Sequence, residues 1–265
     1  MQFGTENGMN LTADYHTHTP YSHGKGTVLE NATRAKELGL AQIGITDHGF
    51  SHIVFGVRRR QVPSLKRECA EAEEKTGVRV LVGMECNIRG RSGLTDLEPS
   101  DYDDFDLFLC GVHLITRYQT MGDLFRFGLR NYFKRKKKSV PRSLVKETTE
   151  AYINTVKNNP IDVLTHVNFQ CFADAVEVAK ACADHGTYLE LSGKKVHFSD
   201  EELFRISQTG VRFVLDSDAH SVNRIGDVSL AEEQIVRVRL PLDRIDNIDG
   251  RLPDFRFAAF KKKRG

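Results

Sequence analysis

Three imidazole side chains fall within eight residues in the stretch Asp14-Tyr15-His16-Thr17-His18-Thr19-Pro20-Tyr21-Ser22-His23-Gly24. Side chains alternate between the two faces of a strand, so His16 and His18 should point the same way from a strand predicted over residues 11–16. The strand should end near Pro20, and the turn beyond it should bring His23 back. Neutral imidazole is a common ligand for zinc, iron, copper and nickel. The stretch therefore predicts the start of a metal site; the alternative is a histidine-rich surface loop that binds nothing.

The composition is typical of a soluble globular protein, with 40% hydrophobic and 28% charged residues among 265. This length suits one large domain, and a single α/β barrel fits it. A net charge of +2 argues against bulk nucleic-acid binding. We expect no membrane segment, because no apolar run is long enough to span a bilayer, and residues 1–8 lack the features of a secretory signal. The five cysteines are scattered and form no CxxC pair, which indicates reduced thiols and a cytoplasmic location.

Apolar runs alternate with helical patterns along the chain. The predicted strands cover residues 11–16, 41–46, 78–84, 106–112, 161–165, 187–192 and 211–215. The predicted helices cover residues 27–39, 63–76, most of 120–158, 172–185, 200–209 and 227–238, after which the chain is expected to be irregular. Such alternation predicts a parallel sheet with helices outside it. In (β/α) barrels the C-terminal ends of the strands form the active-site face, so residues distant in sequence would meet there.

Candidate metal ligands stand where these strands end. They are His16, His18, His23, His48, Glu85, His113, His166, Asp218 and His220. Buried histidines bonded to backbone could account for one or two of them, but not for seven that each follow an apolar strand. In an extended strand the side chain of Asp216 would point to the same face as that of Asp218, so Asp216 is the main alternative to Asp218 as a ligand. Asp47 has the opposite parity to His48 and is expected to support the site through hydrogen bonds.

A known family shows the same series of motifs. The motifs are Asp14-Tyr15-His16-Thr17-His18-Thr19, Thr46-Asp47-His48-Gly49, Gly83-Met84-Glu85-Cys86, His113, His166 and Asp216-Ser217-Asp218-Ala219-His220. In this order, over residues 11–222, they resemble the PHP (polymerase and histidinol phosphatase) family, and the set is specific although each motif alone is weak. The resemblance implies a distorted (β/α)7 TIM-like barrel, with a cluster of up to three metal ions at the C-terminal ends of its strands.

The resemblance also implies how the ligands are shared. His16, His18, Glu85 and Asp218 would surround one ion; Glu85, His113 and His166 would hold a second; and His23, His48 and His220 would hold a third. Glu85 would then bridge the first two ions. Family members use zinc, manganese or iron, and mixed nitrogen and oxygen ligands do not choose between them. We therefore expect two to three divalent ions.

Such a site suits a phosphate ester. The positive charge of the ions exceeds the negative charge of the two carboxylates, and a hydroxide shared by two ions is a nucleophile at neutral pH. The hypothesis is in-line attack by this hydroxide, with Asp218 orienting or deprotonating the parent water. His52 or His197 could protonate the leaving group, although a solvent-exposed role is an equal alternative for each.

Basic residues near the strand ends are candidates for phosphate contacts. Arg117, Lys194 and Arg224 are preferred, and a solvated loop charge is the alternative for each. The segment 117–140 is predicted to be a basic helical insertion that acts as a lid or tracks a nucleic-acid backbone, unless its basic run, Lys134-Arg135-Lys136-Lys137-Lys138, is a solvated helix face. Residues 241–265 form a C-terminal extension, with Lys261-Lys262-Lys263-Arg264 as a flexible basic end or a localisation signal.

The leading function is a stand-alone PHP-domain phosphatase, one domain over residues 1–265, that hydrolyses a phosphomonoester of a small molecule such as histidinol phosphate. The alternative is a PHP-type nuclease acting on DNA, RNA or oligonucleotides; the chain is too short for a polymerase module. A non-catalytic metal-binding scaffold conflicts with the complete ligand set. An amidohydrolase barrel also begins with His-x-His but usually bridges its metals with lysine, where this chain offers Glu85. Motif spacing indicates no oligomeric state.

Overall fold

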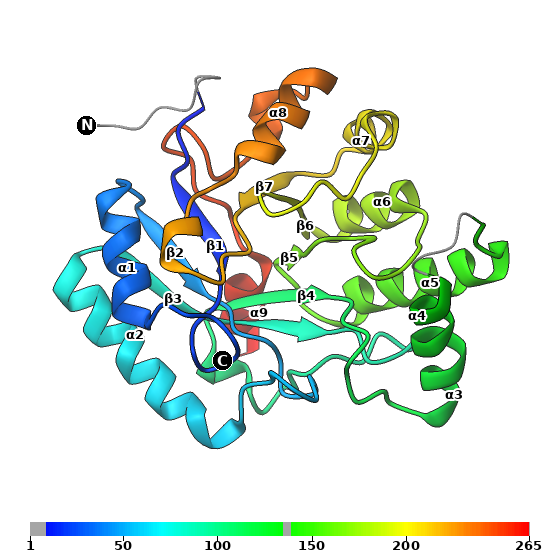
Figure 1. Ribbon diagram of the computed structural model, residues 1–265, viewed down its shortest axis with the longest axis horizontal. Coiled ribbons are helices and arrows are strands. Elements are labelled where there is room, and N and C mark those ends of the chain that lie inside the picture. Colours follow the sequence, from blue (N-terminus) through cyan, green and yellow to red (C-terminus); the bar gives the residue numbers. More distant parts are fainter. Residues whose placement is uncertain (1–8, 135–138, 265) are drawn as a thin grey trace.

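The computed structural model describes residues 9–134 and 139–264. Seven parallel strands pair in sequence order and are surrounded by helices (Figure 1). The strands are β1 (Ala13–Thr17), β2 (Gln42–Ile45), β3 (Arg79–Asn87), β4 (Leu107–Gly111), β5 (Val163–Leu164), β6 (Tyr188–Ser192) and β7 (Phe213–Asp216). Helices on the outside and side chains on the inside bury both faces of the sheet, which is why the strands are almost continuously apolar. The predicted distorted (β/α)7 barrel is confirmed.

The barrel closes between β1 and β7 in two different ways. At the C-terminal ends, Thr17 and Ala219 form a parallel bridge, in which His18 N donates to Ala219 O at 2.9 Å. Nearer the start of β1, the buried Asn247 lies between β1 and β7. Its Nδ2 donates to Ala13 O at 2.8 Å and to Leu215 O at 2.6 Å. Part of the C-terminal extension therefore replaces the missing β1–β7 hydrogen bonds.

Six helices of ordinary length cover the barrel: α1 (Val28–Glu37), α2 (Val62–Thr76), α5 (Arg142–Asn158), α6 (Ala175–His185), α7 (Asp200–Ser207) and α8 (Ser229–Val238). Local sequence signals fix several of their ends. Thr27 and Glu30 form a capping box at the start of α1, and Gly77 ends α2 in the left-handed conformation at φ 75°. No helix within residues 9–134 and 139–264 is long and apolar enough to cross a membrane.

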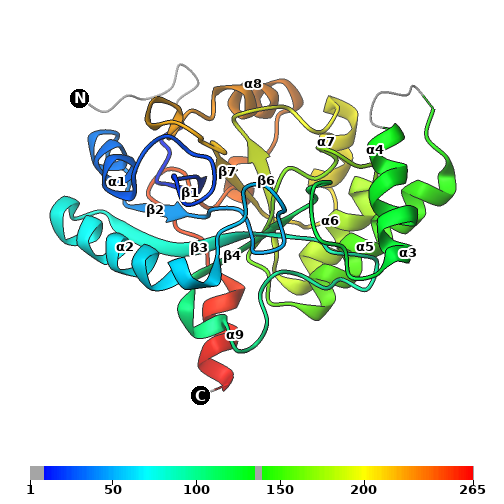
Figure 2. The same ribbon diagram turned by 60° about the horizontal axis from the view of Figure 1, so that its bottom comes forward.

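The predicted insertion after β4 is helical. It contains α3 (Met121–Asp123), a π-helical stretch (Leu124–Leu129) and α4 (Arg130–Lys134), and it lies beside α5 (Figures 1 and 2). Asn131 Nδ2 donates to Thr148 Oγ1 on α5 at 3.2 Å. Residues 135–138 of the basic run lie outside the described residues. The roles of this insertion as a lid or a nucleic-acid contact remain predictions.

The prediction of an irregular, flexible C-terminal end is wrong. Residues 256–264 form the helix α9 (Arg256–Arg264), which is red at the bottom of Figure 2. Phe257 is fully buried, its ring lies 5.6 Å from that of Phe108, and its backbone N–H donates to Asp162 Oδ1 at 2.7 Å. Lys261 of the basic tail donates to the Phe105 carbonyl. The helix forms because Phe257 buries its ring against strand β4.

Candidate metal centre

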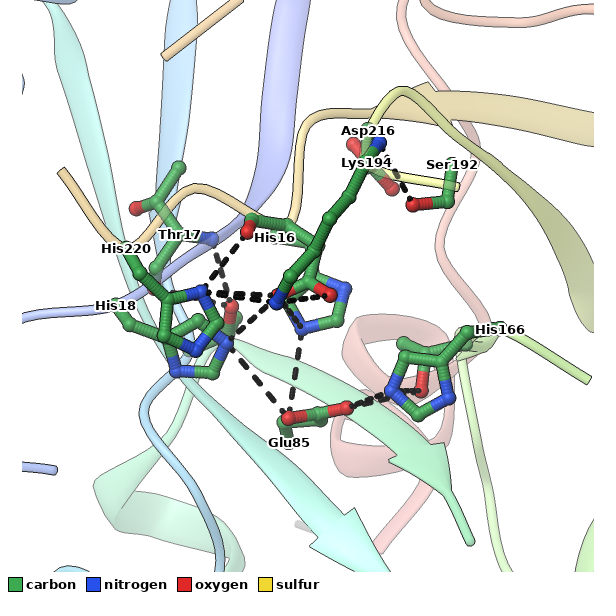
Figure 3. A network of polar contacts seen from close by, with 12 residues as sticks. His16, Thr17, His18, Glu85, His166, Ser192, Lys194, Asp216 and His220 are labelled. Atoms are coloured by element: carbon green, nitrogen blue, oxygen red, sulfur yellow. Dashed lines mark hydrogen bonds and ion pairs between the residues drawn. The ribbon is translucent and has the colours of Figure 1, made fainter. Parts of the chain in front are cut away.

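Glu85, near the end of β3, is the hub of the site (Figure 3). The side chain is fully buried, and its two oxygens face different imidazoles. Glu85 Oε1 lies 2.6 Å from His166 Nε2 and 3.3 Å from His113 Nε2, while Oε2 lies 2.7 Å from His48 Nδ1, 3.4 Å from His16 Nε2 and 3.7 Å from His18 Nε2. One carboxylate thus lies between two sets of nitrogen donors, the arrangement expected of a bridging ligand.

His16 and His18 point the same way, as the strand periodicity predicted. Their ring centroids are 5.1 Å apart, and each presents Nε2 to Glu85 and to Asp218. Asp47 supports the loop that follows them: its carboxylate accepts hydrogen bonds from Thr19 N at 2.8 Å and from Ser22 Oγ at 2.5 Å. The predicted supporting position of Asp47 agrees with these contacts.

Asp218 and Asp216 point to different places. Asp218 Oδ1 lies 3.4 Å from His18 Nε2, whereas Asp216 Oδ1 accepts a hydrogen bond from Tyr15 N at 2.7 Å. Asp218 has φ 47°, a left-handed conformation that is uncommon for a residue other than glycine and is often found at functional sites. The alternation of side chains along a strand could not predict which of the two carboxylates faces the histidines, because the backbone is no longer extended at Asp218.

His23, His48 and His220 come together on the outer side of the centre. The ring centroid of His23 lies 4.1 Å from that of His220 and 4.9 Å from that of His48. The His220 ring is in turn 4.2 Å from the His18 ring. His23 is exposed and His220 half-buried, while His48 is buried. These rings form the solvent-facing part of the histidine cluster.

The donor set fits a group of cations. Within the described residues, His16 Nε2, His18 Nε2, His48 Nδ1 and Glu85 Oε2 are buried and make no hydrogen bond; His48 Nδ1 and Glu85 Oε2 are 2.7 Å apart but are not aligned for one. Buried polar atoms without partners are costly, and a metal ion at their meeting point would remove this cost. Donor atoms within 4.8 Å of one another form four groups: His18, His48 and His220; His16, His18 and Glu85; His16, His166 and Asp218; and His48, Glu85 and His113. His23 belongs to none of these four groups.

The pKa shifts keep Glu85 ionised and His18 and His48 neutral, whereas His16 and His166 shift the other way. Burial lowers the pKa of His16 and of His166, but the neighbouring carboxylates, led by Glu85, outweigh it and raise both. Burial would raise the pKa of Glu85, but the adjacent histidines, led by His113, lower it well below its usual range and keep the carboxylate ionised. Burial lowers the pKa of His48 to about 3, and that of His18 well below its usual value. Neutral imidazole is the form that binds metals.

Two supporting contacts were not predicted from the sequence. Glu190, buried on β6, places Oε1 2.5 Å from His16 Nδ1 and accepts a hydrogen bond from His166 N at 2.7 Å. Asn87 Oδ1 lies 3.0 Å from His113 Nδ1, which leaves His113 Nε2 facing Glu85. Outer partners of this kind fix the orientation of a ligating histidine. The sequence did contain one signal for Glu190, because it is a carboxylate between Leu189 and Leu191 in an otherwise apolar strand.

Replacing Glu190 with glutamine should weaken metal binding by about 10- to 100-fold, the usual effect of removing an outer partner of a metal ligand. Glutamine keeps the shape of the side chain but removes the negative charge beside His16 Nδ1. Competition with a metal-sensitive dye would measure the affinity. Glu177, an exposed residue on α6, provides the control, and unchanged affinity in Glu190→Gln would refute the assigned role.

The predicted phosphate contacts differ in position. Lys194 Nζ lies 2.9 Å from Asp218 Oδ2 and 3.2 Å from His220 Nδ1, at the edge of the centre (Figure 3). Arg224 is paired with Asp227, and its Nη2 is 3.4 Å from the Gly193 carbonyl, beside Lys194. Arg117 is exposed on the loop after β4. Of these three residues, Lys194 makes direct contact with candidate ligands.

His52 and His197 also lie at the centre. The His52 ring stacks 4.9 Å from that of His48, and the His197 ring is 6.0 Å from that of His166. Burial lowers the pKa of His52 to about 4 and that of His197 to about 3. Both rings are therefore neutral at pH 7, which argues against the hypothesis that either protonates the leaving group.

The parallel barrel gathers nitrogen and oxygen donors at the C-terminal ends of its strands, and this fold and site define the protein as a barrel with a candidate metal centre. The model of the PHP domain matches residues 14–195, more than half of the chain. The protein belongs to the PHP family.

Relatives and one solved structure agree with this assignment. A probable phosphatase of Vibrio campbellii is 29% identical over 273 residues, covering 97% of this chain and 95% of that protein. A probable phosphatase of Shewanella piezotolerans is 27% identical and covers 90% of both chains. The histidinol phosphate phosphatase of Lactococcus lactis, solved with zinc, L-histidinol and phosphate, has a TM-score of 0.59 at 17% identity, covering 86% of this chain and 92% of that one. This last likeness shows the shared fold.

Proposed function

We propose that this protein hydrolyses the phosphomonoester of a small molecule, with histidinol phosphate as one candidate substrate. A hydrolase acting on phosphoric ester bonds is the class that the family and its probable phosphatases support. The observation that carries the proposal is the placement of Glu85 between two sets of imidazoles, with the ammonium group of Lys194 beside them. Such a site has donors for cations and a cationic group for an anionic ester.

Two to three divalent ions, drawn from zinc, manganese and iron, would be held by the nine predicted ligands. His16, His18, Glu85 and Asp218 would hold one, Glu85, His113 and His166 a second, and His23, His48 and His220 a third. When bound, such ions lower the pKa of a water and polarise phosphoryl oxygens. The buried donor atoms without partners support bound cations. The groups of donor atoms within 4.8 Å divide the ligands differently, because His48 falls with Glu85 and His113 and also with His18 and His220.

The side chains of this protein would do the remaining work. Asp218 is ionised, because His16 and His18 outweigh the effect of burial and lower its pKa well below the usual range. It is therefore able to orient an attacking water and accept its proton. Lys194 could bind a phosphate oxygen as a point charge. Arg224 would hold the Gly193 carbonyl, and so the loop that carries Lys194.

A substrate panel tests the function. The protein would be reconstituted separately with manganese, zinc and iron, and assayed with histidinol phosphate, other small phosphomonoesters and labelled single-stranded oligonucleotides. We expect phosphate release from small esters without shortening of the oligonucleotides. Shortening without phosphate release would instead support the nuclease, the alternative favoured by the aromatic and basic residues of the insertion after β4.

Replacing His23 with alanine should lower the metal content from about three ions per chain to about two, while the other ions stay bound. His23 lies on the outer side of the centre, beside His48 and His220. Elemental analysis of dialysed protein would measure the ratio, with His185→Ala on α6 as the control. Equal metal content in His23→Ala and wild type would remove His23 from the ligand set.

A further inference from the structure

Four large apolar side chains are exposed beside the metal centre. Ile53, Val54, Phe55 and Ile115, here called the apolar rim, are 58%, 60%, 40% and 52% exposed. They stand on the loops that follow β2 and β4, which are joined where Ile53 N donates to Ile115 O at 3.0 Å. Adjoining exposed apolar side chains on a protein surface often mark a binding site.

Phe55 connects this rim to the candidate ligands. Its ring centroid lies 4.4 Å from that of His23, with an angle of 22° between the planes. The His23 ring is in turn 4.9 Å from the His48 ring, at 11°. The Phe55 ring thus continues a nearly parallel arrangement that begins with two candidate ligands. It also lies 5.5 Å from the His52 ring, at 27°, and Phe55 remains 40% exposed.

The loop that carries Phe55 is held in one conformation. Phe55 N donates to His52 Nδ1 at 3.0 Å, and Gly56 N donates to the His52 carbonyl at 3.1 Å. A Cβ atom at Gly56 would lie 2.6 Å from the Gly49 carbonyl oxygen, so this turn requires glycine. A surface fixed in advance loses little entropy on binding.

We propose that the apolar rim binds the organic part of the substrate, and that Phe55 selects phosphomonoesters whose alcohol carries a planar ring. This inference rests on the proposed function. The phosphate group belongs beside the ligands and Lys194, whose Nζ lies 3.2 Å from His220 Nδ1. The apolar rim borders the same histidine cluster through Phe55, whose ring stacks on His23 and stays partly exposed. Offset-stacked and edge-to-face rings attract beyond simple burial, which favours a ring over an aliphatic group.

Two esters with the same phosphate and similar alcohols provide the test: 2-phenylethyl phosphate and propyl phosphate. In the loaded wild-type protein, kcat/KM should favour 2-phenylethyl phosphate. Phe55→Leu should lower that preference by roughly 3- to 10-fold, because leucine keeps apolar contact without a ring face. Phe55→Tyr, which keeps the ring, should retain the preference, as should Phe204→Ala, which removes an exposed phenylalanine from α7.

Metal content would be measured first in every variant, because Phe55 also covers His23. If metal-loaded Phe55→Leu keeps the wild-type preference for 2-phenylethyl phosphate, the inference is overturned and the proposed function stays intact. A preference lost equally in Phe55→Leu and Phe55→Tyr would also overturn it, since the ring would not be the cause. If loaded wild-type protein hydrolyses neither ester nor any other phosphomonoester in the panel, the proposed function is wrong and the inference falls with it.

Discussion

Replacing Glu85 with glutamine should lower phosphatase activity by about a thousandfold and release most of the bound metal. Glu85 is the one side chain among the described residues whose oxygens face both sets of imidazoles, at 2.6 Å from His166 and 2.7 Å from His48. Glutamine keeps the size of the side chain but removes its charge and one acceptor oxygen. Metal catalysis contributes several kcal/mol, and a loss of about 4 kcal/mol corresponds to roughly a thousandfold in rate.

The measurement is kcat/KM at saturating metal, together with metal content after dialysis. Glu71→Gln, at an exposed position on α2, is the matched control and should behave like wild type. Circular dichroism would show whether the barrel remains folded. Retention of both metal and activity in Glu85→Gln would refute the metal centre, because Glu85 is the carboxylate that faces the ring nitrogens of both His166 and His48.

Replacing Asp218 with asparagine should lower kcat by about 10²- to 10⁴-fold, the usual contribution of a proton-transfer group. The asparagine side chain would fit the same space beside His16 and His18 but could not accept a proton from water. Metal content should fall less than in Glu85→Gln, because His16 and His18 remain as ligands on the same side. Rates measured with metal-saturated protein would separate the loss of catalysis from the loss of metal.

Asp216→Asn is the matched control, two residues earlier on the same strand end. Burial and the nearby Asp14 raise the pKa of Asp216 well above its usual range, which favours the neutral acid. Asparagine resembles that neutral acid and can still accept the hydrogen bond from Tyr15 N. Activity should therefore stay within about threefold of wild type. A greater loss of kcat in Asp216→Asn than in Asp218→Asn would reverse the roles of the two residues.

Much of the fold was predictable because its signals are local. The apolar runs at 78–84 and 106–112 became β3 and β4, since parallel strands buried on both faces must be apolar along their length. Strand β5 is only Val163–Leu164, shorter than the predicted 161–165, because hydrogen-bond pairing with its neighbours, and not hydrophobicity, sets the end of a strand.

The C-terminal extension was predicted poorly because its partners are distant in sequence. Asn247 bonds to Ala13, 234 residues away, and Phe257 bonds to Asp162, 95 residues away. Neither residue belongs to a periodic pattern long enough to stand out. Only the folded chain shows that the extension fills the gap between β1 and β7 and ends in a packed helix.

The sequence alone determined which side chains gather at the centre. Strand ends in a parallel barrel share one face, so nine histidines and carboxylates predicted from strand positions meet there, starting from His16 and His18. Strand periodicity gave the common direction of His16 and His18, and tertiary structure alone decided the orientation of the others. The left-handed backbone at Asp218 separates it from Asp216, Glu190 orients His16 from a strand 174 residues away, and Phe55 stacks on His23. Such contacts depend on backbone dihedral angles and on packing between distant segments, which residue spacing does not encode.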